Sequence, residues 1–393
     1  MTHLNCLVLC TSPLQLVIAQ SAIDALSEKD GRRRKAYGAI IHPLLLEDTK
    51  AAIVAIGSAL SFESVEDYTQ ACHNLFLSVS THSVTKSRPV CGVYRRARNL
   101  VDRFKTTQSE VTSTIYSLMG EVDEVFCRRA SGTIEHLFFA AVDSSPKRYA
   151  IEDGLADHLP SSWKFSHLNS YEIHRWARRR IVELFKFYAS MILTGDPRTS
   201  SMIHSPRKIR WERYFSVTHV NSDLQIASRF KVNILKCSQG YQRDRRQKVI
   251  IFGSLLSRNA GDLSIDDEID FYNLCLPGIQ RRHRITENEI WYKPHPRLPR
   301  DAWERKVSEL ACQVCDLKSQ VLAEVMLQNP NLLAVYSVGS TALIYATAVF
   351  QKPAFQLNLG NKPGAHPSVY QKYRYVNKKF NIPLVDFSAT KII

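Results

Sequence analysis

The chain has 393 residues, 45% hydrophobic and 23% charged, a composition typical of a globular protein with room for two domains. It contains no run of about 18 apolar residues, which excludes a membrane-spanning helix of ordinary length. The net charge of +15 predicts an acidic partner, such as a sugar nucleotide, an anionic glycan or a lipid surface. Because no zinc-finger or aromatic RNA-binding motif accompanies the charge, we expect no nucleic-acid partner.

The first half of the chain alternates between strand-like and helix-like segments. Apolar runs predict strands over 4–10, 36–42, 75–79, 124–127 and 148–151. Helical patterns separate them over 13–27, 51–60, 97–119 and 132–142, and Pro13 stands at the first position of the first helix. This alternation is typical of a parallel, doubly wound sheet.

The pattern is interrupted and then begins again. The segment 195–247 is irregular and basic, with one expected strand over 211–219. Strands follow over 248–256, 289–293, 314–317, 332–337 and 354–357, with helices over 266–280, 303–312, 320–327, 341–350 and 366–373. We therefore predict an α/β protein with Rossmann-like domains over 1–195 and 248–393, joined by a linker region over 196–247.

The first motif follows the strand that ends at Ile151, and reads Glu152-Asp153-Gly154. Neighbouring residues point to opposite sides as the chain leaves a strand, so one carboxylate can face a substrate while the other braces the turn. A carboxylate so placed can remove a proton from an attacking hydroxyl. An ordinary acidic turn is the competing interpretation, since Asp-Gly is a common turn dipeptide.

The second motif, Lys293-Pro294-His295-Pro296-Arg297, also follows an apolar strand. Two prolines stiffen the backbone around the histidine and exclude a helix. An imidazole flanked by two cations is suited to contact a phosphate and to protonate a departing phosphate oxygen. The alternative is a surface histidine in a proline-rich loop.

The third motif, Gly339-Ser340-Thr341, closes one strand and opens a helix. Backbone N–H groups at such a junction favour a phosphate, and Ser340 and Thr341 add hydroxyl donors. Simple N-capping explains the same residues without a ligand. Ser254, in a Gly-Ser turn after another strand, is a weaker candidate of the same kind. Because all three motifs follow strands of open α/β sheets, where ligands bind, we treat them as one site.

No metal site is expected. The acidic residues 262 and 266–268 surround the start of a helix, where carboxylates complement the helix dipole.

Segment 175–193 combines a basic start with a broad apolar side. Such a helix can lie on an anionic membrane surface, although a core helix with a solvated start has the same pattern. We expect a cytoplasmic protein, and peripheral attachment to the inner membrane through this segment is a hypothesis.

Together the three motifs resemble those of bacterial sialyltransferases of GT-B type, both the lipooligosaccharide enzymes and the capsule polysialyltransferases. That family has an acidic-acidic-Gly motif, a His-Pro motif and a Ser/Thr-rich motif in this order. Residues 11–15, Thr-Ser-Pro-Leu-Gln, also resemble the start of the lipooligosaccharide enzymes, and 340–345 resembles the polysialyltransferase pattern.

The resemblance implies a GT-B fold, with two domains facing a central cleft, and inverting transfer of sialic acid from CMP-sialic acid to a glycan hydroxyl, without a cofactor. By position, Asp153 is the general base, His295 protonates or binds the donor phosphate, and Glu152 is structural or auxiliary. Ser340 and Thr341 hold that phosphate, beside Gly339 and the weaker candidate Ser254. The nucleotide pocket is shaped by Lys293 and Pro296, and the cation of Arg297 is expected to bind the donor as well.

Two alternatives remain open at this point. A transferase that uses CMP-Kdo has similar acidic-Gly and Lys-Pro-His-Pro signatures, and motifs alone do not identify the sugar. A non-catalytic protein that binds polyanions or membranes would account for the charge without using Asp153.

Overall fold

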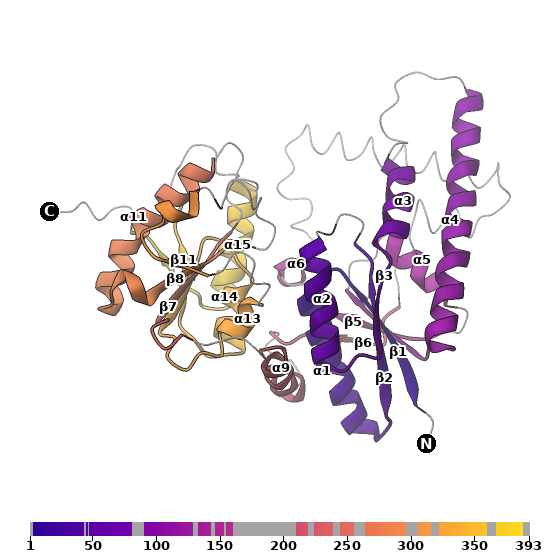
Figure 1. Ribbon diagram of the computed structural model, residues 1–393, viewed down its shortest axis with the longest axis horizontal. Coiled ribbons are helices and arrows are strands. Elements are labelled where there is room, and N and C mark those ends of the chain that lie inside the picture. The colour runs from indigo at the N-terminus through magenta and orange to yellow at the C-terminus, as the bar shows by residue number, and fades with distance from the viewer. Residues whose placement is uncertain are drawn as a thin grey trace. The chain divides into compact units, whose positions relative to one another are not determined.

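The computed structural model describes residues 3–42, 45, 47–80, 90–128, 133–142, 146–152, 155–159, 210–218, 224–238, 244–254, 264–295, 304, 306–315, 322–359 and 367–387. The chain divides into two compact units (Figure 1). Unit 1 comprises Met1–Asp153 and Ser161–Ser216, and unit 2 comprises Gly154–Pro160 and Val217–Ile393.

Unit 1 is built on a parallel sheet of six strands. They are β1 (Leu4–Cys10), β2 (Arg34–Ile40), β3 (Ser64–Asp67), β4 (Glu124–Arg128), β5 (Lys147–Ile151) and β6 (Arg213–Phe215). The helices described in this unit are α1 (Pro13–Asp30), α2 (Glu47–Ala59), α3 (Thr69–Ser80), α4 (Val90–Met119) and α5 (Thr133–Ala141). Figure 1 shows α1 and α2 on one side of the sheet, and α3, α4 and α5 on the other.

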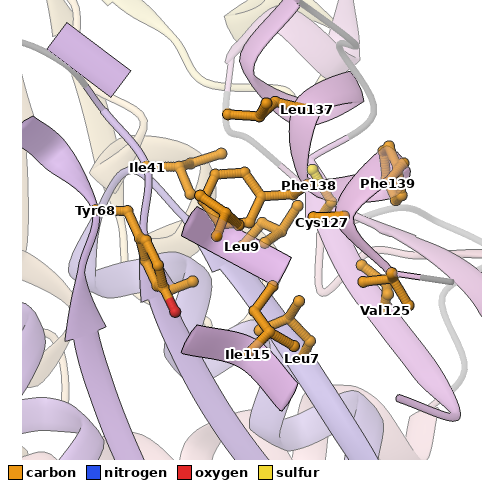
Figure 2. Packing of buried hydrophobic residues seen from close by; sticks show 14 of the residues in the cluster. Leu7, Leu9, Ile41, Tyr68, Ile115, Val125, Cys127, Leu137, Phe138 and Phe139 are labelled. Carbon is orange, nitrogen blue, oxygen red and sulfur yellow. The ribbon is translucent and has the colours of Figure 1, made fainter. Parts of the chain in front are cut away.

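The order of strands in this sheet is β3-β2-β1-β4-β5-β6. This is the order of the classic dinucleotide-binding fold, in which the chain leaves β1 toward one edge and returns beside β1 to build the other. Both faces of β1 are buried, because helices cover both. A core on one face of the sheet holds Leu7 and Leu9 of β1 against Tyr68 and Phe138, as Figure 2 shows. The rings of Tyr68 and Phe138 meet edge to face at 5.2 Å.

Unit 2 repeats this plan. Its strands are β7 (Val249–Phe252), β8 (Ile290–Lys293), β9 (Gln313–Val314), β10 (Ala334–Ser337), β11 (Ala354–Leu357) and β12 (Leu384–Val385). The described helices are α6 (Leu155–His158), α9 (Leu224–Cys237), α11 (Ile265–His283), α13 (Ala323–Met326), α14 (Ala342–Ala348) and α15 (Pro367–Lys379), with 3₁₀ turns Glu287–Glu289 and Val307–Glu309.

The second sheet has the order β12-β11-β10-β7-β8-β9 and is parallel throughout. Counted from β7, this is the strand order of the first sheet. The expected fold class, an α/β protein with two doubly wound Rossmann-like domains, is thus confirmed. The central cleft of the GT-B arrangement stays a prediction.

Several local expectations were wrong. The apolar run 75–79 is part of helix α3 rather than a strand, and short apolar runs do not distinguish the two by periodicity. Of the helix expected over 303–312, the described residues 304 and 306 are helical, but a 3₁₀ turn follows at Val307–Glu309 and 310–312 are not helical. Strands β3 and β12 and helix α9 were not expected; β3 and β12 are short edge strands, which have little hydrophobic pattern.

The region 196–247, expected to be a linker, is divided between the units. Strand β6 completes the first sheet beside β5, whereas α9 belongs to unit 2 and packs on α13. The rings of Phe230 in α9 and Tyr345 in α14 stack with their centroids 5.6 Å apart.

Candidate functional site

In unit 2, three neighbouring strands bring the second and third motifs to one edge of the sheet. Strand β7 pairs with β8 on one side and β10 on the other, with Phe252 opposite Lys293. The backbone N–H of Gly253 then donates to the Lys293 carbonyl at 2.9 Å. Since β7 leads toward one edge of the sheet and β10 toward the other, this is the topological switch point, where open α/β sheets bind ligands.

Serine hydroxyls join the ends of β7 and β10. The Oγ atoms of Ser254 and Ser337 lie 2.8 Å apart, and Ser337 Oγ donates to the Phe252 carbonyl at 2.7 Å. The N–H of Gly339 donates to Ser254 Oγ at 3.0 Å and reaches Ser337 Oγ at 3.3 Å. Ser254, a candidate donor ligand from the sequence, is therefore buried and bonded to the turn that carries the third motif.

The third motif lies at the start of α14, as the sequence predicts. Ser340 and Thr341 are half-buried, and Ser340 Oγ accepts the N–H of Ala342 at 3.2 Å. The Thr341 carbonyl accepts the N–H groups of Ile344 at 2.9 Å and of Tyr345 at 3.2 Å. The capping interpretation is thus compatible with the geometry, and the Ser340 hydroxyl sits where it can serve both a cap and a ligand.

Gly339 is required at its position by an aromatic ring that the sequence did not indicate. A Cβ atom on Gly339 would lie 2.5 Å from Cδ2 and 2.6 Å from Cε2 of Tyr373 in α15. Real Cβ atoms do not approach so closely, so the turn and the ring can coexist only with glycine. The ring thus forms one wall of the Gly339-Ser340-Thr341 turn.

Lys293 is the last residue of β8, and His295 follows the strand at the same edge. Lys293 is 9% exposed and His295 is half-buried. A Cβ atom on Gly253 would lie 2.5 Å from Tyr292 Oη and 3.1 Å from the backbone nitrogen of His295. The absence of a side chain at Gly253 therefore lets the turn after β7 pack directly against the backbone of the histidine motif.

Buried polar side chains lie in the core of unit 2, among them Tyr292 of β8. Tyr272 and Tyr292 are fully buried, with ring centroids 5.1 Å apart. Burial raises the pKa of both hydroxyls well above the usual value, and the carboxylate of Glu268 adds to the effect. Glu268 lies in the first turn of α11, as expected for a dipole-compensating residue, but it is fully buried.

Glu324 is a further ionisable group near Lys293 that sequence analysis missed. Burial raises the pKa of this carboxyl to about 7, against the smaller lowering effects of its own backbone N–H and of the Lys293 charge. The signal in the sequence was a single acidic residue inside the apolar run 322–327. Perturbed ionisable groups of this kind are common at functional sites.

In unit 1, Glu152 of the first motif follows the end of β5. Glu152 is 1% exposed, and its Oε2 accepts the hydroxyl of Ser216 at 2.6 Å. The Glu152 backbone N–H donates to the Phe215 carbonyl at 3.0 Å, which extends the pairing of β5 with β6. Glu152 therefore braces the chain where β5 and β6 end, next to Asp153.

Several sequence predictions concern residues outside the described ranges. These are Asp153 and Gly154 of the first motif, Pro296 and Arg297 of the second, and the membrane-surface segment 175–193. Within the described ranges, no helix is long and apolar enough to cross a membrane, and no three His, Cys, Asp or Glu side chains gather as a metal site would require.

Comparison with known proteins gives a family match over most of the chain. The model of a family described as Alpha-2,8-polysialyltransferase (POLYST) matches residues 6–359. A search of curated proteins found no match.

Solved structures match the chain at low sequence identity and with TM-scores below 0.5. An alpha/beta-galactoside alpha-2,3-sialyltransferase from Photobacterium phosphoreum is 10% identical, with 100% of both chains covered and a TM-score of 0.46. A 2,6-sialyltransferase from a Photobacterium species, in complex with CMP and lactose, is 10% identical over 98% of this chain and 78% of its own, with a TM-score of 0.45. An enzyme described as a putative UDP-N-acetylglucosamine 2-epimerase from Listeria monocytogenes is 11% identical over 99% and 91%, with a TM-score of 0.46. Because this set includes epimerases as well as transferases, it does not discriminate between activities.

Proposed function

We propose, on the premise that the chain belongs to the alpha-2,8-polysialyltransferase family, that it transfers sialic acid from CMP-sialic acid to a hydroxyl of a sialylated glycan. The family match extends over 6–359 and so includes all three motifs. It favours sialic acid over Kdo as the donor sugar.

The observation that carries the proposal is the convergence of β8, β7 and β10 in unit 2. Their ends bring His295, Ser340 and Thr341 to the switch point of one sheet. The donor phosphate would accept hydrogen bonds from the two hydroxyls, and Lys293 would contribute positive charge. Gly339 and Tyr373 shape this turn, while Ser254 acts from behind it through the Gly339 N–H.

His295 is the proposed general acid. Departure of CMP leaves negative charge on a phosphate oxygen, and a proton from the imidazolium would neutralise it. Pro296 and Arg297, next in the chain, would complete the nucleotide pocket. Glu324, whose pKa lies near 7, is close enough to Lys293 to change the charge of this edge with pH.

Asp153 is the proposed general base, and Glu152 the residue that braces it. The base removes the proton of the acceptor hydroxyl, and the oxygen of that hydroxyl attacks the anomeric carbon of the donor sialic acid. The attack comes from the face opposite the phosphate, so the configuration inverts. Charge is balanced by proton transfers at both ends of the reaction, which is why we propose chemistry that needs neither a metal nor a cofactor.

The experiment that tests this proposal measures CMP released from CMP-sialic acid and, separately, from CMP-Kdo. Wild type, Asp153→Ala and His295→Ala are compared with an α-2,8-linked oligosialic acid as acceptor, with and without EDTA. We expect release from CMP-sialic acid alone, insensitive to EDTA, with a loss of about 10²–10⁴-fold in each variant.

His283→Ala is the matched control. This histidine lies at the end of α11, where its Nε2 contacts Tyr336 Oη at 2.7 Å, and it belongs to none of the three motifs, so its variant should retain turnover. CMP release from CMP-Kdo alone would identify Kdo, rather than sialic acid, as the sugar that is transferred. Unchanged turnover in Asp153→Ala would favour the non-catalytic alternative.

Attachment to the cytoplasmic surface of the inner membrane through 175–193 remains a proposal that rests on the sequence. Co-sedimentation with liposomes of neutral and anionic composition tests it, and binding that does not depend on anionic lipid would contradict it.

A further inference from the structure

Arg128 stands at the carboxyl end of β4, at the switch point of the sheet in unit 1. Strand β4 lies between β1 and β5, and the register places Arg128 directly opposite Ile151. Neighbouring strands are about 4.8 Å apart. Arg128 is therefore beside the strand end that continues into Glu152 and Asp153, two residues beyond Ile151.

A buried carboxylate, that of Glu135, fixes the orientation of the Arg128 guanidinium. Its Nε donates to Glu135 Oε1 at 2.7 Å, and Nη2 contacts the same oxygen at 2.7 Å. The Glu135 side chain, on α5, is 2% exposed, whereas that of Arg128 is 31% exposed. A buried glutamate thus holds a partly exposed arginine at the carboxyl end of β4.

We propose that Arg128 binds the carboxylate of the terminal sialic acid of the acceptor. This rests on the proposed function, in which Asp153 takes a proton from that same sugar, so the sugar must lie over the end of β5. A guanidinium matches a carboxylate in shape and charge, and its hydrogen bonds with a carboxylate are among the strong ones.

Both sugars of the reaction carry a carboxylate, so the assignment to the acceptor needs its own reason. The groups proposed for the donor, His295, Ser340 and Thr341, are all in unit 2, whereas Arg128 shares a sheet with the motif that activates the acceptor. The Arg128–Glu135 pair also suits a positioning role. The buried Glu135 limits the motion of the guanidinium before the acceptor binds, so less conformational freedom is lost on binding.

The experiment compares steady-state kinetics of wild type, Arg128→Lys and Arg128→Gln with two acceptors, an oligosialic acid and its analogue with the terminal carboxylate converted to an amide. The KM of wild type for the acid acceptor should be about 10–100-fold lower than its KM for the amide acceptor. This ratio is the one expected for the loss of one charge-assisted hydrogen bond. Arg128→Gln should lose that preference, and Arg128→Lys should retain only part of it. The KM for CMP-sialic acid should change less than threefold.

Arg33→Gln is the control, because it removes an exposed arginine from the opposite, amino end of the same sheet and so makes the same change in charge. Its preference for the acid acceptor should equal that of wild type. If Arg128→Gln is not folded, as judged by circular dichroism, Arg128→Lys decides the result, because its ammonium still neutralises Glu135.

Three outcomes would overturn the inference: equal loss with acid and amide acceptors, a change confined to the KM of the donor, or unchanged preference in Arg128→Lys and Arg128→Gln. Failure of the proposed function is a separate result, seen in wild type itself as no CMP release from CMP-sialic acid with either acceptor.

Discussion

The hydroxyls of Ser254 and Ser337 lie 2.8 Å apart, although 83 positions separate them in the chain. They join the ends of β7 and β10, and the Gly339 N–H donates to Ser254 Oγ. Through this bond the turn after β7 holds the turn that carries Ser340 and Thr341. The conformation of the proposed phosphate-binding turn thus depends on a residue that does not itself belong to it.

We predict that Ser254→Ala weakens donor binding. The variant removes the 3.0 Å bond to the Gly339 N–H and leaves only the 3.3 Å contact with Ser337. The free energy of unfolding should fall by about 1–3 kcal/mol and the KM for CMP-sialic acid should rise by up to about tenfold, measured by urea unfolding and initial rates.

Ser264→Ala is the matched control. It removes the side chain that caps α11 through the Asp267 N–H, which should cost about 1 kcal/mol without affecting the donor. Equal KM values in the two variants would show that Ser254 contributes only stability.

A second prediction concerns the packing of Gly339 against Tyr373. Gly339→Ala places a methyl group 2.5 Å from the ring, so either the ring or the turn must move. We expect the KM for the donor to rise, and Gly339→Ala/Tyr373→Ala to recover part of the loss, with a coupling energy of about 0.5–3 kcal/mol. Tyr373→Ala alone is the reference, and strict additivity of the two single effects would contradict the contact.

A third prediction follows from the raised pKa of Glu324. Its carboxyl ionises near pH 4.5 when unfolded but at about 7 when folded. Between these values the folded state holds a proton that the unfolded state has lost, so stability falls as pH rises from 4.5 to 7, by up to about 3 kcal/mol in total. Below pH 4.5 the Glu324 carboxyl is protonated in both the folded and the unfolded state, so it no longer makes stability depend on pH.

Glu324→Gln should remove this loss, so its gain in stability over wild type should be larger at pH 8 than at pH 4.5. Urea unfolding at both values measures it. Glu287→Gln, which changes an exposed glutamate in the same unit, should keep the pH dependence of wild type. A parallel dependence in wild type and Glu324→Gln would show that this carboxyl ionises normally.

The fourth prediction concerns a buried ion pair in unit 1. Arg34 Nε donates to Glu124 Oε2 at 2.8 Å, Nη2 donates to Oε1 at 3.1 Å, and both side chains are 2% exposed. Glu124→Gln removes one of the two carboxylates that pair with the buried arginine, because Asp30 Oδ2 still contacts Nη2 at 2.7 Å, and it should lower the free energy of unfolding by about 1–3 kcal/mol. Arg34→Met/Glu124→Leu should recover most of this loss in thermal unfolding, whereas equal stability of the single and double variants would contradict the prediction.

The elements that sequence analysis predicted well are those with long, strongly patterned segments. The strand over 4–10 has the predicted bounds because an unbroken apolar run suits a strand covered on both faces. The run 75–79, four apolar residues and Ser78, was assigned wrongly because so short a run does not distinguish a helix from a strand by periodicity. The family resemblance was confirmed, since it rested on three motifs in a fixed order rather than on any one of them.

By itself, the sequence determined that the chain forms two doubly wound α/β units and that His295, Ser340 and Thr341 follow strands, because hydrophobic period and chain-breaking residues are local properties. Only the tertiary structure decided which strands are neighbours. The pairing of β7 with both β8 and β10 brings Ser254 to Gly339, and the pairing of β4 with β5 brings Arg128 beside Ile151. The packing of Tyr373 against Gly339 and the electrostatic interaction of Lys293 with Glu324 likewise join residues that are far apart in the sequence. The energies of these interactions depend on burial, which a local sequence pattern does not record.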